Sequence, residues 1–322
     1  MKFNFLKKFF IVSLIALMLA AFTGCGEQQK AMEQKEFKMV TGDISGTYYP
    51  IGVAIAEVIN KEIPNFNISV DSSKGSIDNI KRIKEGLADF AIIQNDIAYY
   101  ALNGAEMFRN DKVESLRAIA SLYPETCQFV TLADKKIKSI SELRGKKVAV
   151  GSEGSGAEAN ARQILEAYGL TYEDIDAQYL SFSDGSEALK NGKVEAAFLN
   201  AGFPTKAVEN IASTNKIQIL PIDKERSTIL TNLYPYYTKT TIPSGTYSGQ
   251  NEAVDTVSVM AIFVTSNKID DSTGYNIAKA IFSNTDKLES AHSVGKLITK
   301  SNANKGISIK SNAGAEKYFK EN

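Results

Sequence analysis

Segments with strand and helix patterns alternate along almost the whole chain. Residues 37–41, 68–70 and 90–93 are short strand-like runs, and residues 51–59 carry apolar side chains along one face of a helix. The run at 90–93 is apolar throughout, as expected of a strand that is covered on both faces. Alternation of this kind predicts an α/β fold with a mostly parallel sheet.

The order strand, glycine-containing loop and helix occurs twice, at residues 38–60 and at residues 147–168. Each copy would place a helix N-terminus at the carboxyl end of a strand, which is the edge where open α/β sheets bind ligands. The body after residue 36 is also longer than one hydrophobic core comfortably supports. The sequence therefore predicts two α/β lobes.

Two segments are candidates for connections between these lobes. The chain is expected to leave the first lobe between residues 123 and 128, and the alternating strand at 257–264 is expected to return to it. The predicted division assigns residues 37–123 and 258–322 to lobe I, and residues 124–257 to lobe II.

Local signals predict where several elements begin and end. Ser76 is typical of a helix N-cap and Gly86 of a C-cap. Pro204 is expected at the first position of a helix, because its missing N–H is not needed there. Residues 179–180 are expected in a strand.

The N-terminus has the three parts of an export signal. Three lysines precede the apolar run at residues 9–22, which is shorter than the roughly 20 residues that a membrane span requires, and the small residue Gly24 precedes Cys25. This arrangement resembles the lipobox of bacterial lipoproteins, although Phe22 stands where a leucine is usual. We predict a signal peptide at 1–24 and lipidation at Cys25; the alternative is a plain transmembrane anchor.

Residues 25–36 are polar and predict a tether between the lipid and the folded body. The body is then expected outside the cytoplasm, anchored by lipid to a membrane, in the periplasm or at the cell surface. Nucleotide cofactors are scarce there, so no cofactor is expected.

Charge and cysteine content narrow the possible partners. The chain has 37 basic and 37 acidic side chains, and removal of residues 1–24 takes away three lysines and no acid. The resulting slight negative charge predicts no nucleic-acid partner. Cys127 has no partner for a disulfide once Cys25 carries lipid, and it is expected in a buried strand. With a single histidine, His292, no metal site is predicted.

Two glycine-containing loops are candidates for binding an anion. The first offers Ser45, Gly46, Thr47 and Tyr48 before a helix, and the second offers Ser152, Ser155 and Gly156. Glycines allow close approach of a ligand to the backbone, and a helix N-terminus presents unpaired N–H groups. The second loop is no P-loop, because Ala157 stands where lysine is required. Each loop could also be an ordinary connection between strand and helix.

Further residues are predicted at the carboxyl ends of strands, where they would face a cleft. They are Ser76, Gln94, Asn200 and Gly202. Enzyme motifs are weak by comparison: the Ser-x-x-Lys pattern occurs at 213–216 and 293–296, but its Ser-Asp-Asn and Lys-Thr-Gly companions do not occur. We therefore expect a binding protein with no enzymatic activity.

A series of short glycine-containing and polar segments runs along about residues 39–320. In order, the segments are Thr41-Gly42-x-x-x-Gly46-Thr47-Tyr48-Tyr49-Pro50-x-Gly52, Gly75-Ser76-x-x-Asn79, Gly86-x-Ala88-Asp89, Gln94-Asn95-Asp96, Gly151-Ser152-x-Gly154-Ser155-Gly156, Gly202-x-Pro204, Ile242-Pro243-x-Gly245-Thr246-Tyr247 and Gly314-Ala315-Glu316. Together these segments resemble the TAXI family of extracytoplasmic solute receptors, which serve a class of TRAP transporters. Asp43 departs from the family pattern, which often has glycine there, and Asn312 stands where histidine is frequent; the latter is expected to be structural.

The resemblance implies a periplasmic-binding-protein-like fold of the second type, with two lobes joined by two crossing strands. It also implies a monomer that captures glutamate, glutamine or a related dicarboxylate and delivers it to the TRAP membrane permease, driven by an ion gradient. Two alternatives stay open: a receptor for an ATP-binding-cassette (ABC) importer, and a lipoprotein that senses a ligand without a role in transport.

Lipidation can be tested directly. The protein expressed in a bacterium should carry a lipid mass on Cys25, and Cys25→Ser should abolish that mass while export persists. Mass spectrometry of the mature N-terminus measures this, and an unmodified Cys25 in the exported wild-type protein would refute the lipobox interpretation.

Overall fold

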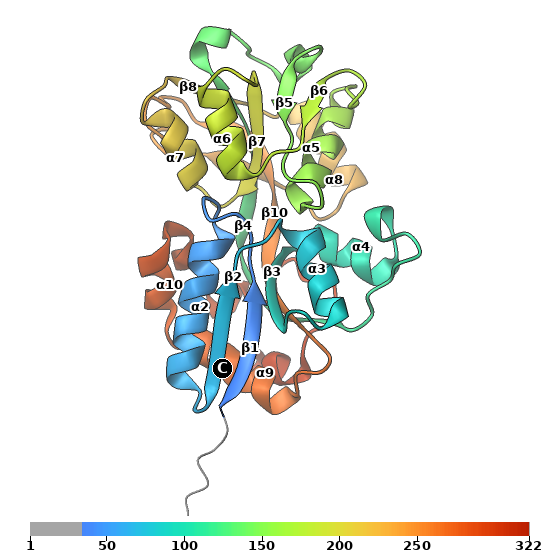
Figure 1. Ribbon diagram of the computed structural model, residues 1–322, viewed down its shortest axis with the longest axis vertical. Coiled ribbons are helices and arrows are strands. Elements are labelled where there is room, and N and C mark those ends of the chain that lie inside the picture. Colours follow the sequence, from blue (N-terminus) through green and yellow to red (C-terminus); the bar gives the residue numbers. More distant parts are fainter. Residues whose placement is uncertain (1–33, 322) are drawn as a thin grey trace, which may run out of the picture. The chain divides into compact units, whose positions relative to one another are not determined.

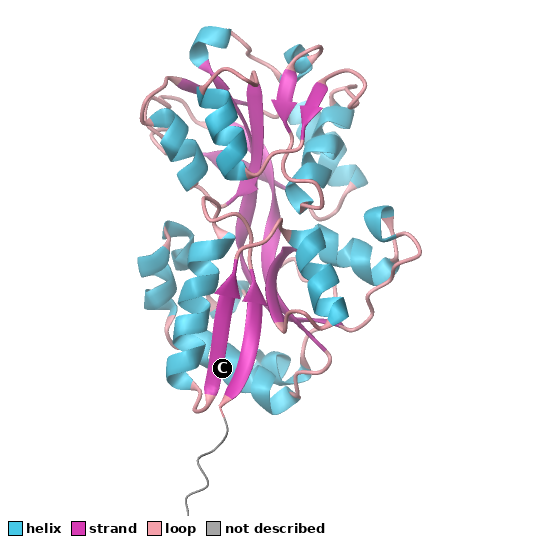
Figure 2. Cartoon of the chain, in the orientation of Figure 1, coloured by secondary structure: helices cyan, strands magenta, loops and turns pink. Residues whose placement is uncertain are grey.

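A mixed sheet of ten strands runs through the body of the protein (Figure 1). The computed structural model describes residues 34–321, and within them the strand order is β2-β1-β3-β10-β4-β7-β5-β6, with β8 on β4 and β9 on β10. The pairs β1–β2, β1–β3, β5–β6 and β5–β7 are parallel, whereas β10 and β4 are antiparallel to each other and to their other neighbours. Helices cover both faces of the sheet (Figure 2).

The elements alternate as the sequence predicts. The strands are β1 (Lys35–Val40), β2 (Phe66–Asp71), β3 (Phe90–Gln94), β4 (Leu116–Leu132), β5 (Lys147–Ala149), β6 (Asp176–Gln178), β7 (Ala196–Ala201), β8 (Ile217–Leu220), β9 (Thr238–Ile242) and β10 (Val254–Ser266). The α-helices are α2 (Tyr48–Glu62), α3 (Ser76–Glu85), α4 (Asn95–Asn103), α5 (Gly156–Ala167), α6 (Phe182–Lys190), α7 (Lys206–Ala212), α8 (Lys224–Leu233), α9 (Asp271–Phe282), α10 (Thr285–Ala291) and α11 (Ala313–Glu321).

Two long strands, β4 and β10, connect the two halves of the sheet (Figure 1). Near its start β4 pairs with the end of β10, which also pairs with β3, whereas the last part of β4 pairs with β7 and β8. The segment 123–128 lies inside β4, and 257–264 lies inside β10. We keep the names lobe I and lobe II for the two predicted sets of residues; their exact bounds stay a prediction.

Apolar clusters fill both faces of the sheet in each lobe. In β3, Phe90 and Ile92 belong to one cluster, while Ala91 and Ile93 belong to the cluster on the opposite face. In β7, the neighbours Phe198 and Leu199 divide in the same way. Successive side chains of a strand point to opposite faces, so a strand covered on both sides must be apolar throughout.

Some predicted element ends are correct and others are wrong. Gly86 is the left-handed C-cap of α3 at φ 72°, as predicted. Ser76 does not cap that helix: Gly75 holds the cap position, and the Ser76 hydroxyl accepts a hydrogen bond from the backbone N–H of Gln94 at 3.0 Å. Pro204 does not begin α7, since Thr205 is the residue before its first turn. Residues 179–180 follow β6 and lie outside it.

Two further expectations concern single residues and the N-terminus. Cys127 is buried within β4, as predicted. The predicted signal peptide and Cys25 lie outside the described residues. Among the residues that are described, no helix has the length and apolar character to span a bilayer.

Asn312 is structural, as expected. It is 3% exposed, and its side-chain oxygen accepts hydrogen bonds from the backbone N–H groups of Gly314 and Ala315 at the start of α11. Its amide nitrogen donates to the carbonyl oxygen of Ile269 before α9. The residue therefore caps α11 and joins it to the neighbouring helix.

Loss of this cap should destabilise the protein. Asn312→Ala should lower the free energy of unfolding by about 1–2 kcal/mol, because both a cap and a buried hydrogen bond are lost. Asn312→Ser keeps a capping oxygen without adding a charge, so its effect should be smaller. Urea unfolding measures both, and equal midpoints for wild type and Asn312→Ala would contradict this role.

Candidate functional site

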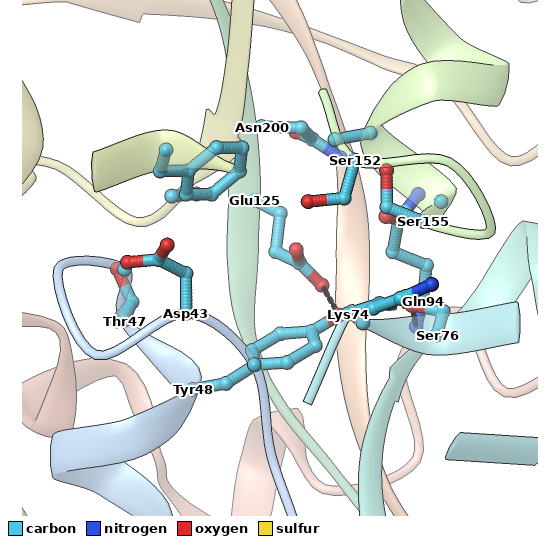
Figure 3. A pocket seen from close by; sticks show the side chains of 17 residues that line it. Asp43, Thr47, Tyr48, Lys74, Ser76, Gln94, Glu125, Ser152, Ser155 and Asn200 are labelled. Carbon is cyan, nitrogen blue, oxygen red and sulfur yellow. Dashed lines mark hydrogen bonds between the residues drawn. The ribbon is translucent and has the colours of Figure 1, made fainter. Parts of the chain in front are cut away.

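A cavity with about 480 Å³ of empty space lies where residues of lobe I, lobe II and β4 meet (Figure 3). It is bordered by the loop before α2, the N-terminus of α3, the end of β3, the loop before α5, the start of α6 and the end of β7. The residues that line it are Gly42, Asp43, Gly46, Thr47, Tyr48, Lys74, Gly75, Ser76, Gln94, Glu125, Ser152, Ser155, Gly156, Ala157, Phe182, Asn200 and Ala201.

Most of the predicted site residues line this cavity. The structure brings together Gly46, Thr47, Tyr48, Ser76, Gln94, Ser152, Ser155, Gly156 and Asn200. Ser45 and Gly202 lie outside the lining. The Ser45 hydroxyl donates to Asp43, and the Gly202 carbonyl oxygen accepts from the hydroxyls of Thr47 and Thr205. These two residues contribute to contacts beside the cavity. That the lining residues bind a ligand stays a prediction.

Four lining residues with charged or aromatic side chains were absent from the predicted set: Asp43, Lys74, Glu125 and Phe182. The sequence does carry a signal for Glu125, because this acidic residue lies in the strand-like stretch that is expected to connect the lobes. An ionisable group inside a buried strand is rare and often functional. For Lys74 and Phe182 the sequence carries no comparable signal, since each lies in a segment of ordinary surface composition.

Asp43 joins the loop before α2 to lobe II. Its carboxylate accepts hydrogen bonds from the hydroxyl of Ser183 at 2.7 Å and from the backbone N–H of Ser183 at 3.3 Å, in the first turn of α6. Within its own loop it accepts from the N–H and hydroxyl of Ser45. Burial alone would raise the pKa of Asp43, but these hydrogen bonds outweigh it and hold the pKa below its ordinary value. The ionised carboxylate thus ties the two lobes together.

The loop before α5 approaches lobe I closely. The Ser155 hydroxyl caps α5 by accepting from the N–H of Glu158 at 3.1 Å, and the carbonyl oxygen of Gly154 accepts from the N–H of Asp78 in α3. Gly156 packs on Gln94: a Cβ at Gly156 would lie 2.2 Å from the side-chain oxygen of Gln94. Glycine is required there because only a bare backbone admits the glutamine.

Glu125 forms the floor of the cavity. It is 2% exposed, and Tyr48 donates its hydroxyl to Oε1 of Glu125 at 2.6 Å, as the dashed line in Figure 3 marks. Burial raises the pKa of Glu125 well above its ordinary value; the bond from Tyr48 opposes this shift, and the nearby Asp96 adds to it. A buried carboxylate is costly, so burial favours the protonated form of this group.

A buried polar network lies behind this floor and spans both lobes. Asn160 of α5 donates to Asp96 and to the hydroxyl of Tyr237, both at 2.8 Å, and accepts from Gln94 at 2.6 Å and from Asn200 at 2.8 Å. Burial raises the pKa of Asp96 to about 6 despite these hydrogen bonds. The network fixes the orientation of the two amides, Gln94 and Asn200, that line the cavity.

Metal-binding groups are not assembled at this site. Within residues 34–321, no three or more His, Cys, Asp or Glu side chains are placed to hold a metal ion together. Cys127 is buried, and burial raises the pKa of its thiol well above the ordinary value, so it is an unreactive thiol. The lining residues offer hydrogen-bond donors and acceptors together with charged side chains.

Two lobes around a cavity, joined by two crossing strands, define the fold of the periplasmic binding proteins, which confirms the predicted fold class. The periplasmic aliphatic sulphonate binding protein SsuA from Escherichia coli is similar at 14% identity and a TM-score of 0.50, over 88% of this chain and 78% of that chain. PhnD1 from Prochlorococcus marinus (MIT 9301), in complex with methylphosphonate, is similar at 12% identity and a TM-score of 0.56, over 90% and 97% of the two chains.

Comparison of the sequence with known protein families gives a match. The NMT1-like family matches residues 39–322, which is nearly all of the body that the structure describes. The chain belongs to this family.

A side chain at position 156 should prevent the lobes from approaching. Gly156→Val places a branched side chain against Gln94, and overpacking of this kind costs about 1–3 kcal/mol, which the protein can avoid by opening. The variant should show a larger radius of gyration in small-angle scattering. Glu153→Val, with the same new side chain at an exposed position of the same loop, is the matched control and should scatter like wild type.

Proposed function

We propose that the protein is an extracytoplasmic solute-binding receptor. The observation that carries this proposal is a cavity lined from both lobes, which β4 and β10 connect. Such an arrangement can enclose a small molecule by a change in the angle between the lobes. The similar structures are binding proteins, which supports a role in binding without catalysis. The same likeness supports a location outside the cytoplasm, and the predicted Cys25 lipid would anchor the receptor to the membrane.

The ligand proposed from the sequence is a small carboxylate, with glutamate, glutamine or a related dicarboxylate as candidates. The N-terminus of α5 supports this choice, because its first N–H groups and the hydroxyls of Ser152 and Ser155 border the cavity. Ser155 uses its oxygen lone pair to cap the helix, so its hydroxyl proton stays free to donate to an anion. Lys74 supplies the one cationic side chain among the lining residues.

Two classes of importer are candidates for the membrane partner. The TRAP permease rests on the resemblance of the sequence segments to the TAXI family. The NMT1-like family and the likeness to binding proteins for sulfonate and methylphosphonate support the ABC alternative better. We therefore propose an ABC permease first and keep the TRAP permease as the second candidate.

Transport assays separate these alternatives. Deletion of the gene should abolish high-affinity uptake of the ligand. Uptake that follows cellular ATP and survives collapse of the ion gradient supports an ABC partner, whereas the reverse supports a TRAP partner. Unchanged uptake after deletion, with ligand binding intact, would point to the sensing lipoprotein.

Ser155 provides the direct test of the anion site. Ser155→Ala removes a donor to a charged acceptor and should weaken binding of the carboxylate ligand about tenfold to a hundredfold, measured by calorimetry. The control is Ser181→Ala, because Ser181 caps α6 in the same way and does not line the cavity. Equal affinities of wild type and Ser155→Ala, with the fold intact, would place the carboxylate elsewhere.

A further inference from the structure

The floor of the cavity presents an oxygen atom that no described residue pairs. Glu125 uses Oε1 to accept the hydrogen bond from Tyr48, and its Oε2 has no hydrogen-bond partner among residues 34–321. Oε2 is also absent from the buried side-chain atoms that lack a partner, so it reaches the open space of the cavity. In its ionised form this carboxyl group, which is 2% exposed, therefore directs one free acceptor at a ligand.

A second acceptor lines the same cavity. The amide nitrogen of Gln94 donates to Asn160 at 2.6 Å and to Asp96 at 3.2 Å. An ionised carboxylate can only accept, so the bond to Asp96 fixes which end of the amide is nitrogen. The side-chain oxygen of Gln94 is thereby left without a partner among the described residues, and it too is not enclosed by protein.

No cation of the described chain compensates these acceptors. Glu125 takes part in no ion pair there, and Lys74, which lines the same cavity, makes none with it. The ionisable groups that interact with Glu125 are Tyr48, Tyr123, Cys127 and Asp96, and none of them supplies positive charge. The cavity thus has acceptors at the floor and donors at the N-terminus of α5.

We propose that the ligand carries a protonated amine, which binds to Glu125 Oε2 and the side-chain oxygen of Gln94 while the ligand carboxylate binds at the start of α5. This inference rests on the proposed receptor function and narrows its substrate class to amino acids and similar amino-carboxylates. An ammonium group has three donors and a full charge, and charge-assisted hydrogen bonds are the stronger kind. A dicarboxylate without an amine supplies no positive charge for Glu125 and no donor for the Gln94 oxygen, and it is disfavoured for that reason.

The ionisation of Glu125 follows from this arrangement. A neutral carboxyl that meets an ammonium group gains by losing its proton, since the ion pair then offsets the cost of burial. The proton leaves Glu125 for the solvent, and the ligand amine keeps its own. Binding of an amine-bearing ligand near neutral pH should therefore release up to one proton, which buffers with different heats of ionisation reveal in calorimetry.

Matched pairs of compounds test the proposal on the wild-type protein. The probes are the twenty common amino acids, each compared with the same acid lacking the amine, for example L-glutamate with glutarate and L-alanine with propionate. The amine-bearing member should bind about tenfold to a hundredfold more tightly, as expected for a hydrogen bond to a charged group. Equal or tighter binding by the acid without the amine overturns the inference and leaves the receptor function standing. Binding by none of these compounds counts against both.

A variant of Glu125 then tests whether this residue binds the amine. Glu125→Gln keeps the shape of the side chain and removes the charge, so it should lose most of the preference for the amine and the release of the proton. Glu153→Gln makes the same change at an exposed acid outside the lining and should behave as wild type. If folded Glu125→Gln keeps both the preference and the proton release, Glu125 does not bind the amine.

Discussion

The pairing of β4 with β10 is the constraint on which the rest of the structure depends. These two strands belong to both halves of the sheet, and their register places Glu125 opposite Val259 and Pro124 opposite Met260. Proline has no N–H to donate to the ladder, and the register shifts between Met260 and Ile262. The ladder is therefore interrupted where the strands pass from one lobe to the other, next to the carboxyl group at the floor of the cavity. A change in the angle between the lobes would meet least resistance there and would act on the ligand site directly.

Three polar contacts join the lobes beside the cavity. They are Asp43 with Ser183, the Thr47 hydroxyl with the Gly202 carbonyl, and the Asp78 N–H with the Gly154 carbonyl. Each of these groups can exchange its partner for water on opening, so each contact contributes only about 1–3 kcal/mol net, with the ionised Asp43 at the upper end. Contacts of this strength can be lost when the lobes open, so ligand binding can shift the balance between open and closed forms.

The sequence was sufficient to predict the elements whose form depends on residues close by in the chain. Strands such as β3 are apolar because both faces are covered, and glycine-containing loops before α2 and α5 mark the two sides of the cavity. It was insufficient where the role of a residue depends on a partner far away in the sequence. Ser76 has the composition of a cap, but its hydroxyl accepts from Gln94, eighteen positions further along. Asp43 becomes a contact between lobes only through Ser183, which lies on α6. No local pattern contains that pairing.

Glu125 shows why the substrate class depends on the floor of the cavity more than on the anion site. Helix N-termini at strand ends recur throughout α/β folds, and they accept carboxylate, sulfonate or phosphonate alike because each presents charged oxygen atoms. That half of the site cannot discriminate among small anions. The floor can, because a buried carboxyl group and an amide oxygen with fixed orientation reject any ligand that leaves them unpaired. In the proposed receptor, selectivity therefore arises on β4 and β3. Because β4 also connects the lobes, the ligand would be recognised next to a strand that joins them.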